Sequence, residues 1–188
     1  SIHNTIVNSL ETMLRESTNE TLEHSKRLEY LATNLGEKLD LSGHELNVLA
    51  SLANLHDIGK ITIAKEILQK PTSLNDKEWE EIKRHPEAGY KIAKSSPKLN
   101  NVAEGILYHH ERWDGNGYPQ GLSGEQIPLL ARIINIVDSY DVMTSSRPYK
   151  EAMNKNEALK EVEKCAGSQF DPNISKIFIK MMKNYINK

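Results

Sequence analysis

The sequence predicts an all-α fold, a single helical bundle, and three observations lead to that prediction. Apolar residues recur at steps of three and four along nearly all of the 188 residues. No alternating stretch is long enough to form a useful strand, and helix-capping signals recur between the apolar stretches. The length favours one compact domain over two. We therefore expect one domain over residues 1–188.

The first half of the chain predicts five helices. The first four are expected over residues 2–17, 19–39, 43–56 and 76–84. Ser42 with Glu45, and Asn75 with Glu78, have the spacing of a capping box, so each pair marks the start of a helix. Pro86 suits the first turn of the fifth helix, where its missing N–H costs nothing.

The second half predicts four helices and one long loop. The helices are expected over 96–111, 128–144 and 154–167, with a last one after Asp171 and Pro172, an N-cap and first-turn pair. Between the first two, residues 112–128 are rich in glycine and proline and have no periodicity. A loop of this length usually carries function or is disordered.

Composition excludes several classes of protein. With 24 Lys and Arg against 26 Asp and Glu, the net charge is -2 and no basic block occurs, so we expect no DNA or RNA partner. The one cysteine allows neither a disulfide framework nor a thiolate zinc site, and it suits a reducing compartment such as the cytoplasm. No apolar run is long enough to span a membrane.

The amino end suggests that this chain is a module of a longer protein. Ser1 is not an initiator methionine. We expect an upstream sensor or receiver domain, with residues 1–17 serving as a linker or a dimerisation helix, and hence a homodimer as one arrangement.

Histidines and carboxylates lie on apolar helical stripes. His56 ends the stripe of Leu46, Leu49 and Ala53, and His109 ends a second stripe with the same spacing. His24 begins a third stripe with Glu20 one turn before it, and Asp138 follows an apolar run. Four helices thus direct imidazole or carboxylate groups toward the core. Because a buried ionised carboxylate is costly unless it is paired or binds a metal, the group predicts a metal centre.

The pattern of donors also indicates the kind of metal. Adjacent residues project about 100° apart on a helix, so His56 with Asp57, and His109 with His110, can each reach two neighbouring ions. Imidazole and carboxylate donors without thiolate favour iron or manganese, with zinc as an alternative. Taken alone, each of these histidines, His85 included, is more often an ordinary core or surface residue.

The motifs resemble those of a known family. LHDIGK (Leu55 to Lys60) and HHERWDGNGYP (His109 to Pro119) are similar to the paired signature of HD-GYP proteins, a branch of the HD phosphohydrolases that degrades cyclic di-GMP. The resemblance extends over nearly the whole chain. It implies an HD-type helical bundle with a metal centre in its core and a long GYP loop, which is the loop over residues 112–128. We expect Tyr118 to pack this loop down in preference to stacking on guanine.

The resemblance also assigns roles to individual residues. It implies metal ligands at six positions, His56, Asp57, His85, His109, His110 and Asp138. Glu20 and His24 match relatives that hold a third ion. Lys60 matches a catalytic residue that contacts phosphate or the bridging solvent, and Arg147 and Lys150 match residues that hold the substrate phosphates. Without the resemblance, these three cationic residues would be interpreted as surface charges.

The implied activity is hydrolysis of cyclic di-GMP to pGpG, and then to GMP, by a hydroxide that bridges two or three divalent metal ions and is anchored by Asp57. Two alternatives stay open. The enzyme could act on another cyclic dinucleotide such as cyclic GMP-AMP, because metal ligands do not distinguish the bases. The chain could also be a non-catalytic module that binds cyclic di-GMP or a protein partner through the GYP loop.

Overall fold

A computed structural model describes residues 2–18, 21–146 and 151–186, and it confirms the all-α prediction. The ten α-helices of the described residues are α1 (Ile2–Ser17), α2 (Leu22–Lys38), α3 (Gly43–Leu55), α4 (Lys65–Leu68), α5 (Asp76–Ile82), α6 (His85–Lys94), α7 (Ala103–Tyr108), α8 (Leu129–Thr144), α9 (Lys155–Lys164) and α10 (Pro172–Ile186). Three 3₁₀ helices accompany them, η1 (Ile58–Thr62), η2 (Asn100–Val102) and η3 (Gly124–Gln126). The only β-structure in these residues is two isolated bridges.

The capping signals act as the sequence predicts. Both capping boxes form: the Ser42 and Asn75 side chains accept from the backbone N–H three residues on, and the glutamates bond back. Each box satisfies two backbone donors that the first helical turn leaves open. Asp171 caps α10 by accepting from the N–H groups of Asn173 and Ile174 at 2.8 and 3.2 Å.

The helix expected over 96–111 is shorter in the structure. The chain first turns through η2, and α7 covers only Ala103–Tyr108. Beyond it, the Asn135 amide of α8 donates to the carbonyls of His109 and Glu111, at 3.0 and 2.8 Å. Because these carbonyls accept from another helix, α7 can end at Tyr108 without leaving buried acceptors unpaired. The short elements η1 and α4 were not predicted.

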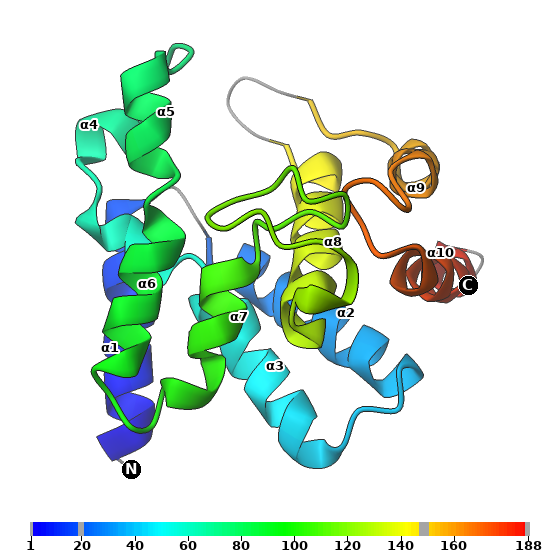
Figure 1. Cartoon of the computed structure of the whole chain (residues 1–188), viewed down its shortest axis with the longest axis horizontal. Coiled ribbons are helices and arrows are strands. Elements are labelled where there is room, and N and C mark those ends of the chain that lie inside the picture. The colour runs from blue at the N-terminus through cyan, green and yellow to red at the C-terminus, as the bar shows by residue number, and fades with distance from the viewer. Residues whose placement is uncertain (1, 19–20, 147–150, 187–188) are drawn as a thin grey trace.

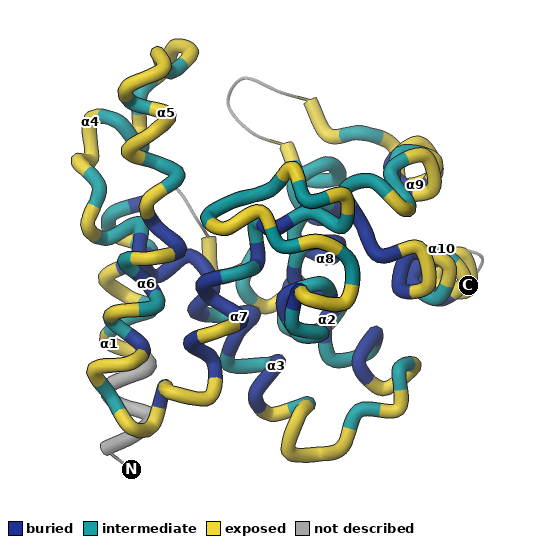
Figure 2. Tube along the Cα trace, in the orientation of Figure 1, coloured by how far each residue is buried: buried dark blue, intermediate teal, exposed yellow. Residues whose placement is uncertain are grey.

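The helices bring distant parts of the chain together (Figure 1). α2 packs against α3 and α8, while η1 lies between α1 and α6, and α6 packs on α7. Figure 2 shows buried positions gathered along α3 and α7 and near the start of α6. The ends of several helices therefore meet in the interior, where the sequence predicts the metal centre.

Gly59 permits the closest of these approaches. A Cβ at this position would overlap the carbonyl oxygen of His85 and lie 2.6 Å from the backbone nitrogen of Gly89. Only glycine lets η1 and α6 pack this closely, so Gly59 sets the distance between Asp57 and His85.

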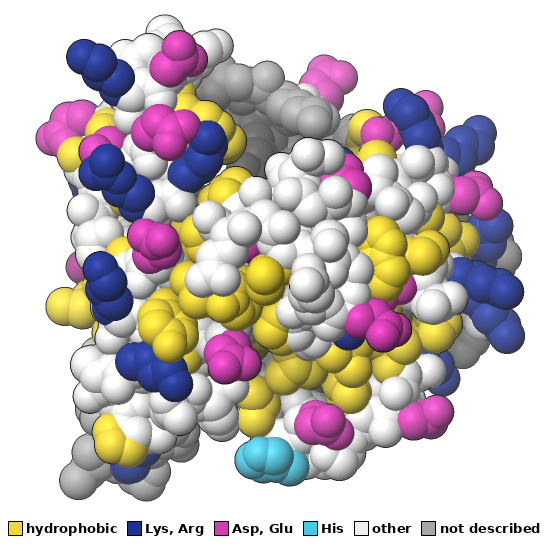
Figure 3. Space-filling view, in the orientation of Figure 1, with side chains coloured by type: hydrophobic (Ala, Val, Ile, Leu, Met, Phe, Trp, Pro, Cys, Tyr) yellow, Lys and Arg dark blue, Asp and Glu magenta, His cyan; other side chains and the backbone are white. Residues whose placement is uncertain are grey.

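The surface agrees with the balanced charge of the sequence. In the view of Figure 3, acidic and basic side chains are interspersed over most of the face, and basic side chains gather along the right-hand edge, beside α9 and α10. Among the described helices, none is both long enough and apolar enough to cross a membrane.

Candidate metal centre

Seven of the eight predicted metal ligands lie in the described residues, and their ligand atoms form two groups. Asp57, His85, His109 and His110 make the first group, and His24, His56 and Asp138 make the second. Within each group the ligand atoms lie within 4.8 Å of one another. The first group is built where η1, α6 and α7 meet, and the second joins α2, α3 and α8. Glu20 lies outside the described residues.

The first group is centred on the carboxylate of Asp57. Its Oδ1 lies 3.0 Å from Nε2 of His85 and 3.6 Å from Nε2 of His109. The Nε2 atom of His85 is also 3.4 Å from that of His109 and 3.2 Å from that of His110. Asp57, His85 and His109 are all at least 95% buried, since their exposed fractions are 5%, 1% and 2%. Three ring nitrogens thus converge on one buried carboxylate.

Backbone carbonyls fix which ring nitrogen carries the proton. The Nδ1 atoms of His56, His85 and His109 lie 2.9, 2.6 and 2.7 Å from the carbonyl oxygens of the residues three positions earlier. A carbonyl oxygen only accepts, so each Nδ1 must donate. In the neutral imidazole, Nε2 then carries a lone pair, and this lone pair points toward the group.

Burial keeps His109 and His110 neutral while Asp57 stays ionised. Desolvation lowers the pKa of His109 to about 4 and holds the pKa of His110 well below the ordinary histidine value. Burial alone would raise the pKa of Asp57, but the charge of Lys60, together with contacts to His56 and His109, outweighs it and holds that pKa well below its usual range. Metal binding requires neutral imidazoles and an ionised carboxylate.

The second group is linked to the first through the adjacent residues His56 and Asp57. His56 Nε2 lies 3.4 Å from Oδ2 of Asp57 and 4.0 Å from Oδ1 of Asp138, and His24 Nε2 lies 3.8 Å from the same Asp138 oxygen. The adjacent residues His56 and Asp57 therefore reach into different groups, as the sequence predicts. His109 and His110 both reach into the first group.

These residues fit divalent metal ions. The Nε2 lone pairs of His85 and His109 face one another across 3.4 Å, and a cation placed between them turns this repulsion into ligation. The imidazole and carboxylate donors, with ring protons committed to carbonyl acceptors on the opposite side, are typical of metal-ligating histidines. The buried cluster therefore supports divalent metal binding.

The predictions for Lys60 and Tyr118 can be compared with the geometry. Lys60 lies one turn after Asp57, and its ammonium donates to Oδ2 of that carboxylate. Tyr118 stacks on His110 with ring centroids 4.9 Å apart, so the tyrosine packs the GYP loop onto the centre. Arg147 and Lys150, the predicted phosphate-binding residues, lie outside the described residues.

Sequence reasoning missed the residue that holds the loop. Glu111 is 2% exposed, and its carboxylate accepts from the backbone N–H groups of Gln120, Gly121 and Leu122 at 2.7, 3.1 and 3.0 Å. It also missed Asp141, which binds His24 and Arg27. A glutamate directly after two histidines was the available signal for Glu111, but nothing in the sequence paired Asp141 with α2.

Comparison with known proteins assigns the family. A family model described as an HD domain matches residues 8–174. The chain belongs to the HD domain family. This assignment confirms the resemblance to HD phosphohydrolases, and the matched residues include every member of both groups.

The HD domain is similar to curated phosphodiesterases. It is 40% identical over 166 residues to the cyclic di-GMP phosphodiesterase of Thermotoga maritima, covering 87% of this chain and 45% of that protein. It is 31% identical over 183 residues to the 3'3'-cGAMP-specific phosphodiesterase 2 of Vibrio cholerae, covering 96% of this chain and 35% of that protein. The chain thus spans less than half the length of these relatives.

A solved structure supports the fold. The crystal structure of the cyclic GMP-AMP-specific phosphodiesterase V-cGAP3 of V. cholerae superposes with a TM-score of 0.73 at 24% identity, covering 95% of this chain and 48% of that one. The HD-type helical bundle is therefore confirmed.

Proposed function

We propose that this HD domain is the catalytic domain of a metal-dependent phosphodiesterase that hydrolyses cyclic di-GMP to pGpG and then to GMP. One observation carries the proposal: the Nε2 atoms of buried histidines converge on the ionised Asp57, with their ring protons held on the opposite side by carbonyls. The similarity to a relative named as a cyclic di-GMP phosphodiesterase supports the choice of substrate.

We propose that the centre holds two or three divalent ions, iron or manganese, and that Glu20 and His24 hold the third. When bound, such ions supply a hydroxide nucleophile at neutral pH and compensate the charge of the phosphate oxygens. The donor set supports iron or manganese because it contains nitrogen and oxygen but no thiolate.

The chain's own residues have three roles in this proposal. Asp57 reaches both groups, since Oδ1 faces His85 and His109 while Oδ2 faces His56 and Lys60. Lys60 places a positive charge beside the centre, where it can hold a phosphate oxygen. Arg147 and Lys150 would bind the remaining phosphate charge and orient the scissile bond, which phosphoryl transfer needs more than a side-chain nucleophile.

We place this activity in the cytoplasm, because a single cysteine suits a reducing compartment. The upstream domain and the homodimer formed through residues 1–17 stay predictions.

Turnover by the metal-loaded protein tests the proposal. The protein is stripped with a chelator, reloaded with Mn²⁺ or anaerobically with Fe²⁺, and incubated with cyclic di-GMP, and the products are separated by chromatography. We expect no turnover by the stripped protein, and pGpG followed by GMP after reloading. Full turnover by the stripped protein, or none after reloading to two ions per chain, would contradict the proposal.

The same assay separates the rival substrate. A relative of similar coverage is named as specific for 3'3'-cGAMP, so both cyclic dinucleotides are compared by kcat/KM. A higher value for cyclic di-GMP supports our assignment, and a higher value for cyclic GMP-AMP reverses it. Tight binding of cyclic di-GMP by the reloaded protein without hydrolysis would instead favour the non-catalytic module.

A further inference from the structure

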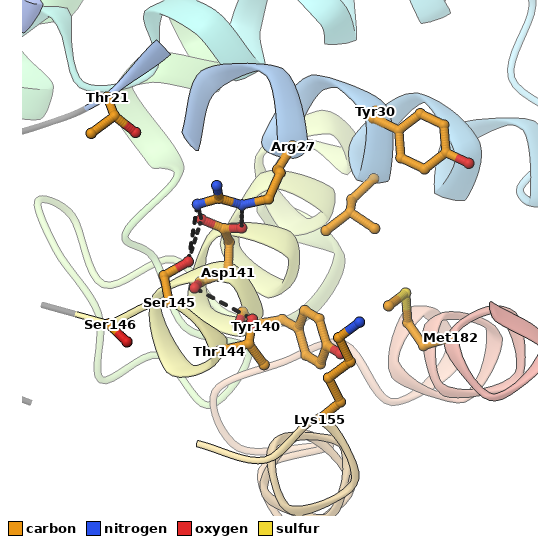
Figure 4. Close-up of a pocket in the computed structure, with 11 residues that line it drawn as sticks. Thr21, Arg27, Tyr30, Tyr140, Asp141, Thr144, Ser145, Ser146, Lys155 and Met182 are labelled. Carbon is orange, nitrogen blue, oxygen red and sulfur yellow. Dashed lines mark hydrogen bonds and ion pairs between the residues drawn. The ribbon is translucent and has the colours of Figure 1, made fainter. Parts of the chain in front are cut away.

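Asp141 makes a contact to the metal centre that the ligand assignment does not use. It lies on α8 one turn beyond Asp138 and is 2% exposed. Its Oδ2 is 2.7 Å from Nδ1 of His24, and Arg27 binds it with two hydrogen bonds, Nε to Oδ1 at 2.7 Å and a terminal guanidinium nitrogen to Oδ2 at 3.0 Å. Figure 4 shows Arg27 and Ser145 converging on this carboxylate.

The contact determines the proton position on His24. An ionised carboxylate only accepts hydrogen bonds, so Nδ1 of His24 donates to Asp141, and Nε2 faces Asp138, 3.8 Å from its Oδ1. His56, His85 and His109 obtain the same arrangement from backbone carbonyls. His24 lies in the first turn of α2 and obtains it from a side chain of another helix.

Arg27 makes this arrangement rigid. Two parallel hydrogen bonds from a guanidinium fix the plane of a carboxylate, and the positive charge offsets the cost of burying it. A terminal nitrogen of Arg27 also donates to the Ser145 hydroxyl at 3.0 Å. Arg27 and Asp141 both line a cavity of about 560 Å³, but the Arg27 side chain is 46% exposed and that of Asp141 only 3%, so the guanidinium covers most of the carboxylate.

We infer that Asp141 is a positioning residue for metal binding, which holds His24 in the ligating tautomer and is itself held by Arg27. The inference rests on the metal centre of the proposed function. Asp141 should therefore affect metal binding by the group of His24, His56 and Asp138, because His24 is the member of that group to which Asp141 bonds.

The test is a titration of the metal-free protein with Mn²⁺ alone, in which electron paramagnetic resonance counts the free ion. Asp141→Asn keeps the volume, but its amide can either accept from Nδ1 or donate to it, so both tautomers of His24 become populated. We expect the affinity for one Mn²⁺ ion to fall about 10- to 100-fold, the usual cost of losing a hydrogen-bond partner of a metal ligand. The affinity for any other ion should not change.

Nitrogen-15 NMR of the metal-free protein reads the tautomer directly. The resonances of His24 should report a proton on Nδ1 in the wild type and a mixture in Asp141→Asn. A purely structural ion pair would not shift this signal. Arg27→Lys keeps the charge but loses the two-bond geometry, so it provides a milder second variant with a smaller loss of Mn²⁺ affinity.

The chain offers a matched control. Arg132 of α8 pairs with Asp171 at 2.7 Å, and both side chains are largely buried. Asp171→Asn removes the same charge from an arginine pair and preserves a good N-cap residue. We expect it to lower the melting temperature without changing Mn²⁺ affinity or the His24 tautomer.

Each unfavourable outcome has a distinct meaning. Unchanged Mn²⁺ binding in Asp141→Asn, when His24→Ala loses an ion, overturns the positioning role and leaves the proposed function intact. Equal losses in Asp141→Asn and Asp171→Asn also overturn it, because the effect would then be general destabilisation. If His24→Ala itself loses no ion, His24 is not a ligand, and the second group of the proposed metal centre fails with it.

Discussion

Glu111 allows a quantitative test of how the GYP loop is held. Its Oε1 accepts from the N–H groups of Gln120 and Gly121, and its Oε2 accepts from that of Leu122. In Glu111→Gln, an amide oxygen can replace only one of these oxygens. The amide NH₂ must then face a backbone N–H, and two donors oppose each other in a buried site.

The magnitude follows from these three bonds. Leaving one buried donor unsatisfied costs about 1–3 kcal/mol, and changing two charge-assisted bonds to neutral ones costs about 1 kcal/mol each. Glutamine carries no charge, so the cost of burying the charge of Glu111 is no longer incurred and offsets part of this loss. We therefore expect a loss of about 3 kcal/mol in the free energy of unfolding. For a chain of this length, the melting temperature should fall by roughly 6–12 °C.

Thermal unfolding followed by circular dichroism measures this shift. Glu125→Gln is the control, since Glu125 is an exposed glutamate of the same loop. A melting temperature of Glu111→Gln indistinguishable from that of the control would refute the argument. It would mean that the three N–H groups find other partners and that Glu111 does not hold the loop against His110.

The remaining predictions address the site and the packing that supports it. Asp57→Asn should abolish cyclic di-GMP turnover while the circular dichroism spectrum stays helical, because the substitution keeps the volume but removes the charge shared by both groups; a near-normal rate would show that the centre is wrongly assigned. Arg147→Ala should raise KM and leave the metal content unchanged, and loss of metal would make this arginine structural. Glu20→Ala should lower the metal count by one and let pGpG accumulate relative to GMP, and unchanged metal content with unchanged product ratios would leave a centre without the third ion. Gly59→Ala should lower the free energy of unfolding by at least about 3 kcal/mol, because its Cβ would overlap the His85 carbonyl. Gly43→Ala has open space around its Cβ and should be neutral or stabilising. Equal effects of the two variants on the urea midpoint would contradict the packing of η1 on α6.

The candidate site was predictable where helical periodicity determines direction. His56 and His109 each end an apolar stripe, and both are 2% exposed in the structure. A residue on the buried face of an amphipathic helix must point inward, so spacing along the chain was enough to place them together.

Contacts between helices could not be predicted in the same way. Asp141 reaches Arg27 and His24 only because α8 lies against α2, and nothing in the local sequence encodes that distance. The early end of α7 has the same origin, since Asn135 satisfies the carbonyls beyond Tyr108. Tertiary partners decide such features, and local propensity does not.

X-ray absorption at the iron edge of the anaerobically reconstituted protein tests the central claim most directly. We expect iron ligands of nitrogen and oxygen alone and an iron–iron distance of about 3.5–4 Å, the spacing of paired catalytic ions. A spectrum without an iron–iron contribution, or less than one tightly bound ion per chain, would contradict a centre built on Asp57 and its converging histidines.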